Sequence, residues 1–175
     1  MVRLNANPNS LDLSVLKQCE ELYLSNTINA QGLETLTQLK KLEVSESLSG
    51  KWVSNVSGLK TPMVNLQSLS INSCFYMTKL FSLHNVVTID IQNCRALSDV
   101  TALKNCPLLK TVFLKQTVVN HLELHPDVVL DYLDISNTLI QNMDNIHSKH
   151  ISIGNSLLQT VEASPHTTHL LLSNS

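Results

Sequence analysis

The chain has 175 residues, of which 31 are leucine, and 43% of its residues are hydrophobic, which argues against disorder. Charged residues make up 15% and the formal net charge is −2, so the composition offers no electrostatic case for a nucleic-acid groove or an anionic membrane surface. Four cysteines in 175 residues are too few for a disulfide-stapled mini-domain.

One short motif recurs from the start of the chain to its end. It consists of an apolar residue, any residue, a second apolar residue, two further residues and a small polar residue. The spacing between successive strong copies is 20, 27, 20, 23, 21, 18 and 19 residues. Eight strong copies and a weaker one at the start predict short strands whose first apolar residues are Val2, Leu22, Leu42, Leu69, Ile89, Val112, Leu133, Ile151 and Leu170.

Two apolar residues at positions i and i+2 point to the same face of a strand. A strand this short cannot bury that face alone, so successive strands must stack about 4.8 Å apart into a parallel sheet with one buried face. The small polar residue lies where the chain leaves each strand, and there it can hydrogen-bond backbone groups that have no ladder partner. These residues are Thr27, Ser47, Cys74, Cys94, Thr117, Thr138 and Ser156.

The segments between the strands are expected to be irregular, extended or short helical turns. Apolar residues spaced by three, such as Leu33, Leu36 and Leu39, keep their side chains pointing inward. The longest unit, between Leu42 and Leu69, has about seven surplus residues that should bulge outward, with Gly and Pro marking the turns.

The repeated pattern L-x-x-L-x-L-x-x-(N/C/T/S)-x-(L/I/V) resembles that of the leucine-rich repeat family over nearly the whole chain. The resemblance implies an α/β solenoid, a curved array with a parallel β-sheet on its concave face and a mostly irregular or short helical convex side. Residues 1–175 are then a single domain of about eight to nine repeats. Both ends look cut through the array, so we expect a segment of a longer array.

The run from Cys94 to Leu109, with Cys106-Pro107 ahead of the next strand, resembles the cysteine-containing repeat subclass. That subclass is common in substrate-recognition subunits of ubiquitin ligases. The repeats here are shorter, and short Ser/Thr/Cys-rich repeats also resemble leucine-rich repeat proteins of unicellular parasites and some bacteria. The sequence leaves both possibilities open.

No catalytic residue, metal ligand or cofactor site is expected. The pairs His121/His125 and His147/His150 fall on no predicted helix, so we expect solvated loop histidines. Cys74 and Cys94 occupy one column and should point inward as small hydrophobes. No nucleophile-elbow or phosphate-loop motif occurs, and glycine is scarce.

The outward strand positions are the candidate binding residues, because a rigid sheet presents them at fixed spacing. Phe113 and Tyr132 should form one patch on neighbouring strands, with Lys115 and Asp134 at its rim. His150 and His169 are also outward positions. The alternative is that the aromatic rings merely cover the sheet or pair across it. The full candidate set is Tyr23, Glu43, Asp90, Phe113, Lys115, Tyr132 and Asp134.

We therefore expect a protein–protein interaction module with a scaffold or substrate-recognition role, and not an enzyme. A cell-surface adhesin or receptor ectodomain, and a regulatory segment of a larger enzyme, are the alternatives. The partner is another protein, with no nucleic acid and no membrane insertion, and uncapped ends favour self-association. Without a signal peptide or membrane span the expected location is cytoplasmic, with the cell surface as the alternative if the parent protein is longer and secreted.

Overall fold

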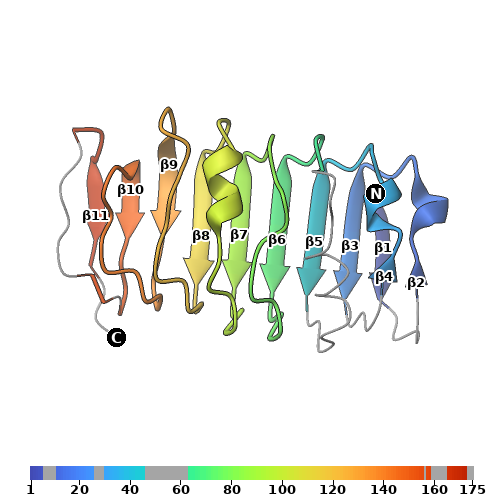
Figure 1. Ribbon diagram of the computed structural model, residues 1–175, viewed down its shortest axis with the longest axis horizontal. Coiled ribbons are helices and arrows are strands. Elements are labelled where there is room, and N and C mark those ends of the chain that lie inside the picture. The colour runs from blue at the N-terminus through green and yellow to red at the C-terminus, as the bar shows by residue number, and fades with distance from the viewer. Residues whose placement is uncertain (6–10, 26–29, 46–62, 156, 159–164, 173–175) are drawn as a thin grey trace.

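The computed structural model describes residues 1–5, 11–25, 30–45, 63–155, 157–158 and 165–172. They form a parallel β-solenoid of about 7 turns with repeats of about 20 residues. Its strands stand side by side along the long axis of the molecule (Figure 1). The main sheet contains, in order, β1 Val2–Asn5, β3 Glu21–Ser25, β5 Lys41–Ser45, β6 Ser68–Asn72, β7 Thr88–Gln92, β8 Thr111–Lys115, β9 Val129–Asp134, β10 His147–Ser152 and β11 His169–Leu171.

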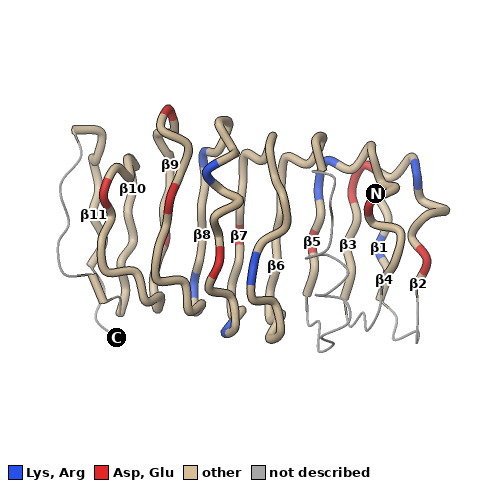
Figure 2. The backbone as a smooth tube through the Cα atoms, in the orientation of Figure 1, with Lys and Arg blue, Asp and Glu red and all other residues tan. Residues whose placement is uncertain are grey.

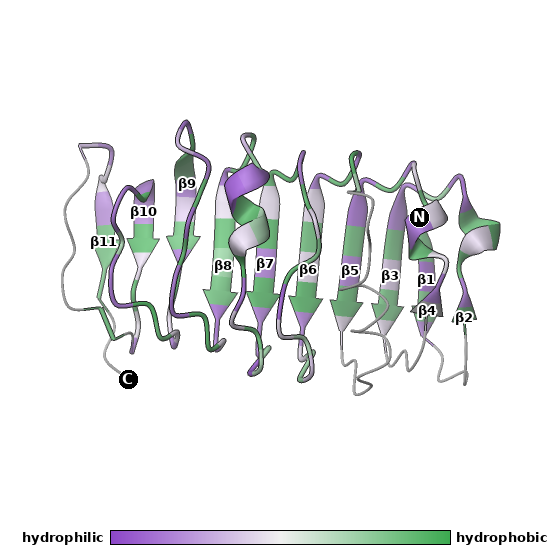
Figure 3. Ribbon diagram, in the orientation of Figure 1, coloured by the Kyte–Doolittle hydropathy of each residue, from purple (hydrophilic) through white to green (hydrophobic). Residues whose placement is uncertain are grey.

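Every neighbouring pair in this sheet is parallel, and the apolar positions of the repeat lie in register. The first apolar residues form one column along the whole described sheet, and the second ones form another from Leu4 of β1 to Leu114 of β8. This confirms the predicted strand register, including the weaker first copy at Val2. The alternation along each strand is visible as bands of hydrophobic and hydrophilic colour (Figure 3). The first column reads Val2, Leu22, Leu42, Leu69, Ile89, Val112, Leu133, Ile151 and Leu170.

The core lies between the sheet and the returning segments. Leu133, Ile89 and Ile91 are at most 1% exposed, as predicted, and Ile135 is fully buried just beyond the end of β9. The columns predicted from residues spaced by three are also buried, including Leu33, Leu36, Leu39, Leu80, Leu83, Val100 and Leu103.

The returning side contains only short structure in the described residues. A second, two-stranded parallel ladder joins β2 Leu11–Asp12 to β4 Ala30–Gln31. Three 3-10 helices follow: η1 Ser14–Leu16, η2 Leu33–Thr35 and η3 Thr101–Asn105. The expected short helical turns are therefore confirmed, but the α component of the α/β class is wrong for this part of the chain. A repeat of about 20 residues leaves too little chain for a longer helix beside a strand.

The surplus residues of the long repeat between Leu42 and Leu69 fall mostly in 46–62, outside the described residues. The sheet nevertheless passes from β5 to β6 with all five residue pairs in register, from Lys41↔Ser68 to Ser45↔Asn72. The insertion is thus accommodated without a shift in the ladder.

The described turns after β6 to β10 use two adjacent residues, of which the sequence pattern predicts only one. Thr117 Oγ1 donates to the Leu114 carbonyl at 3.1 Å, and Thr138 Oγ1 donates to the Ile135 carbonyl at 2.7 Å, as expected for the small polar position. The residue just before it adopts a left-handed conformation, which asparagine tolerates better than most residues. These residues are Ser73, Asn93, Gln116, Asn137 and Asn155, with φ between 48° and 57°.

Gly32 packs two turns of the solenoid together on the returning side. Its φ is 81°, and a Cβ added there would lie 2.8 Å from the backbone nitrogen of Ser14. We expect Gly32→Ala to lower the free energy of unfolding by about 1–3 kcal/mol, because it combines a strained backbone with a clash against backbone atoms. Urea unfolding followed by circular dichroism measures this, with the exposed neighbour Gln31→Ala as control. Equal stability of the two variants would contradict the close approach.

The strand β11 lies at one edge of the main sheet as described, and the leucines in it and just after it are poorly covered. Leu170 is 42% exposed, Leu171 66% and Leu172 70%. We expect amide hydrogen exchange beyond His166 to be much faster than at Ile91, or the protein to self-associate through this edge. Exchange mass spectrometry together with a sedimentation measurement tests both outcomes. Equal protection of Leu172 and Ile91 in a monomer would contradict them.

Candidate functional site on the main sheet

The outward face of the main sheet holds every residue of the predicted binding set. The strands are paired in register, so their outward side chains form columns that cross the sheet with a step of about 4.8 Å. Lys115, on β8, lies in the outward column next to the middle one. Tyr132, on β9, lies in the outward column on the other side of the middle one. The middle column contains Tyr23, Glu43, Asp90, Phe113 and Asp134, with Ser70 between Glu43 and Asp90.

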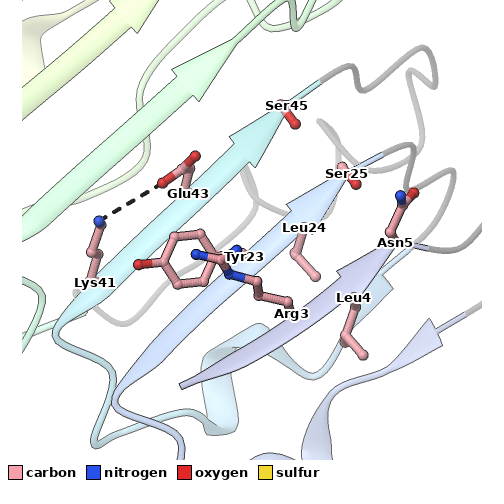
Figure 4. Close-up of a pocket in the computed structure, with 9 residues that line it drawn as sticks. All are labelled: Arg3, Leu4, Asn5, Tyr23, Leu24, Ser25, Lys41, Glu43 and Ser45. Carbon is pink, nitrogen blue, oxygen red and sulfur yellow. Dashed lines mark ion pairs between the residues drawn. The ribbon is translucent and has the colours of Figure 1, made fainter.

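At the β1 end the face is built around Tyr23. Its ring lies between two cations, with the Arg3 guanidinium carbon 4.8 Å and the Lys41 Nζ 5.0 Å from the ring centre. Lys41 also pairs with Glu43 at 3.8 Å. The hydrogen bond to Tyr23 raises the pKa of Lys41 above its ordinary value, and Glu43 adds to this. These residues line a depression of about 480 Å³. Figure 4 shows Arg3, Tyr23 and Lys41 together on the sheet, with the ion pair of Lys41 and Glu43.

The middle of the face is flat and polar. The Gln92 Nε2 donates to Asp90 Oδ1 at 2.8 Å, and Asn93 Nδ2 donates to Asn72 Oδ1 at 3.2 Å. The outward side chains of β6 are serines and an asparagine. Asp90 is therefore held in a local network, and the polar strip separates the Tyr23 group from the aromatic residues farther along the sheet.

At the β11 end, Phe113 and Tyr132 come from neighbouring strands, as predicted. Their strand positions are diagonal, because Phe113 is directly opposite Asp134 and Tyr132 is opposite Thr111. Tyr132 is 50% exposed, Phe113 is partly buried, and both line a depression of about 220 Å³ together with Leu171. The two rings thus belong to one patch.

Asp134 differs from the exposed rim residue that we expected, because it is only 7% exposed. Its Oδ2 pairs with Lys115 Nζ at 3.0 Å, and its Oδ1 accepts the Ser136 backbone N–H at 2.9 Å. The Lys115 Nζ lies 5.8 Å from the centre of the Phe113 ring. Asp134 therefore holds Lys115 beside the aromatic patch and offers little surface of its own.

The histidines near the β11 end are arranged differently from the expectation. His147 and His150 lie in β10, so their interpretation as loop residues is wrong. The His150 ring stacks on Tyr132 at 4.6 Å and on His169 at 4.5 Å, with interplanar angles of 13° and 20°. We call Tyr132, His150 and His169 the ring ladder. Beside it, the rings of His147 and His166 meet edge to face at 5.7 Å.

A sequence signal for the ring ladder exists. The pattern H-x-x-H occurs at His147/His150 and again 19 residues later at His166/His169, which is one repeat length. Equivalent positions in successive turns of a solenoid lie side by side, so the repetition itself predicts paired rings. The spacing between the two pairs, one repeat length, therefore carries more information than the spacing within each pair.

The cysteines are part of the core. Cys19, Cys74, Cys94 and Cys106 are buried and form no disulfide. The hydrogen bond to Cys74 lowers the pKa of the Cys94 thiol, while burial raises the pKa of Cys106 to about 11. Cys94 Sγ donates to the Gln92 carbonyl, two residues back, at 3.3 Å, whereas Thr117 and Thr138 bond the carbonyl three residues back. Among the described residues no group of three or more His, Cys, Asp or Glu side chains is placed to hold a metal ion.

The fold and the face together define a parallel β-solenoid that presents a broad outward sheet. The chain matches no protein-family model, no curated protein and no solved structure at a significant level. None of its described helices has the length and apolar character needed to span a membrane.

Proposed function

We propose that the chain is a leucine-rich repeat array that binds another protein through the outward face of its main sheet, in a scaffold or substrate-recognition role. The observation that carries this proposal is the patch of Phe113 and Tyr132, which opens outward on strands paired in register. Aromatic side chains with a half-exposed surface and a charged neighbour such as Lys115 are typical of binding hot spots.

The family assignment rests on the match between the repeat and its structural roles. The two apolar columns face the core, and the small polar position bonds backbone carbonyls at the strand exit. We also propose that the array is curved and that the main sheet lies on its concave side.

The physics of the sheet favours binding over catalysis. Its outward side chains are held by backbone pairing and by local contacts, such as the pair of Lys115 and Asp134, so little conformational entropy is lost when a partner docks. In the part of the chain that the structure describes, Lys and Arg are interspersed with Asp and Glu (Figure 2), which does not favour the continuous positive surface that a nucleic acid requires.

Crosslinking capture from an extract of the source cells tests the proposal. Wild-type protein is compared with the variant Phe113→Ala/Tyr132→Ala and with Lys104→Ala/Gln141→Ala, two exposed positions outside the main sheet. We expect a protein that is captured by the wild type and by the Lys104/Gln141 variant but lost with the aromatic variant. Capture that survives the aromatic change and disappears with the Lys104/Gln141 change would overturn the proposal.

A further inference from the structure

We infer that the face around the ring ladder binds an acidic, aromatic-containing segment of the partner protein, and that protonation of its histidines strengthens this binding. The inference rests on the function proposed above, and it adds the chemistry of the partner segment and the dependence of binding on pH. Four of the seven histidines of the chain contribute, and all four are in β10, in β11 or just before β11: His147, His150, His166 and His169.

The carboxylates that face these histidines are mostly engaged by lysines. Lys149 Nζ pairs with Asp131 Oδ1 at 2.7 Å and lowers the pKa of Asp131. Lys115 pairs with Asp134 on the other side of the ladder. With neutral imidazoles the outward charges of β8 to β11 therefore balance.

The described turns that lead into β8, β9 and β10 add a few charges, among them Lys110, which precedes β8 and acts on Asp131. Before β9, His125 Nδ1 lies 3.7 Å from Asp127, and Asp144 lies in the turn before β10. Tyr132 is the remaining titratable group on the ladder. Imidazole side chains as a class gain their charge between pH 8 and pH 5. Acidification therefore favours positive charge on a face whose strand carboxylates, Asp131 and Asp134, are already paired with lysines.

Because the imidazole rings are stacked, positive charge on them depends on a nearby anion. Two imidazolium rings 4.5 Å apart, as in the pair of His150 and His169, repel each other. A carboxylate placed over the pair relieves that repulsion. Proton uptake and binding of an anionic partner are therefore linked, and each favours the other.

The apolar surface beside the charges identifies the anion as a peptide. Phe113, Tyr132 and Leu171 line the depression of about 220 Å³, which can take an apolar or aromatic side chain next to the histidines. Nucleic acids rely on many permanent Lys and Arg contacts with phosphates, and the two lysines here are paired with Asp131 and Asp134. An acidic peptide with an aromatic residue complements both parts of the face.

The test measures fluorescence anisotropy of a labelled peptide made of Glu-Glu-Phe repeats, with the full chain at pH 7.5 and pH 5.5. We expect Kd to fall at least about tenfold at the lower pH, because two or more imidazoles take up protons on binding. A peptide with glutamine in place of glutamate should show no such gain. Circular dichroism at both pH values checks that the fold is retained.

Two variants separate the causes. His150→Gln/His169→Gln should abolish the pH dependence, and the matched control His121→Gln, at an exposed position outside β8 to β11, should keep it. Equal affinity of the wild type at both pH values, or an unchanged pH dependence in the double variant, would overturn the inference. Stronger pH-dependent binding of a single-stranded oligonucleotide or of phosphatidylserine vesicles would overturn the assignment to a peptide.

The experiments distinguish a failure of this inference from a failure of the proposed function. If Phe113→Ala/Tyr132→Ala weakens peptide binding while the histidine variant behaves as the wild type, the face binds protein without the proton control. If neither pair of changes affects binding, and the aromatic variant also captures the same proteins as the wild type, the outward face is not the binding surface.

Discussion

Replacing Ile91 by alanine is expected to lower the free energy of unfolding by about 2–4 kcal/mol. Ile91 is fully buried, and it lies in the second inward column between Ile71 of β6 and Leu114 of β8. Its truncation removes contacts to the turns on both sides and leaves a cavity that a rigid ladder cannot close. Urea unfolding followed by far-ultraviolet circular dichroism measures the loss.

A control on the same sheet separates this effect from a general sensitivity of the repeats. Ser70→Ala changes an outward side chain of β6, one residue from the inward Ile71, and should alter stability by less than about 0.5 kcal/mol. If Ile91→Ala unfolded at the same urea concentration as the wild type, the strand register would be wrong.

Truncation of either aromatic side chain of the patch, Phe113→Ala or Tyr132→Ala, is expected to weaken partner binding by about 1–3 kcal/mol. The reason is that each ring has substantial surface free to be covered by a partner, next to a depression and a positioned lysine. Stability should fall less than in Ile91→Ala, because neither ring belongs to the buried columns. Calorimetric titration with the captured partner gives the binding loss, and urea unfolding gives the stability.

The controls are again Lys104→Ala and Gln141→Ala, which should bind with the wild-type affinity. A double-mutant cycle of Phe113 and Tyr132 adds a finer test. Their diagonal placement on β8 and β9 and their shared depression predict that the two losses are not additive. Wild-type affinity in the double variant would remove the patch from the binding surface.

The strands and their inward faces could be predicted from the sequence because their signal is local. A pair such as Ile89 and Ile91 defines the buried face of its own strand, and its recurrence every 20 residues or so defines the neighbour. Phe113 and Tyr132 could be placed on adjacent strands for the same reason. The register of β5 and β6 was predicted correctly despite the 27-residue spacing between Leu42 and Leu69, because the same motif resumes after it.

Contacts between side chains of neighbouring turns were decided only by the tertiary structure. Asp134 looks like any outward residue in the repeat, yet its ion pair with Lys115 and its turn hydrogen bond cover it. The repeat places His150 in one column with Tyr132 and His169, but packing decides that the three rings stack nearly parallel. A period of two along a strand specifies the face on which a side chain lies. Which side chains then touch depends on the stacking of turns whose lengths differ, and on the rotamers that this packing permits.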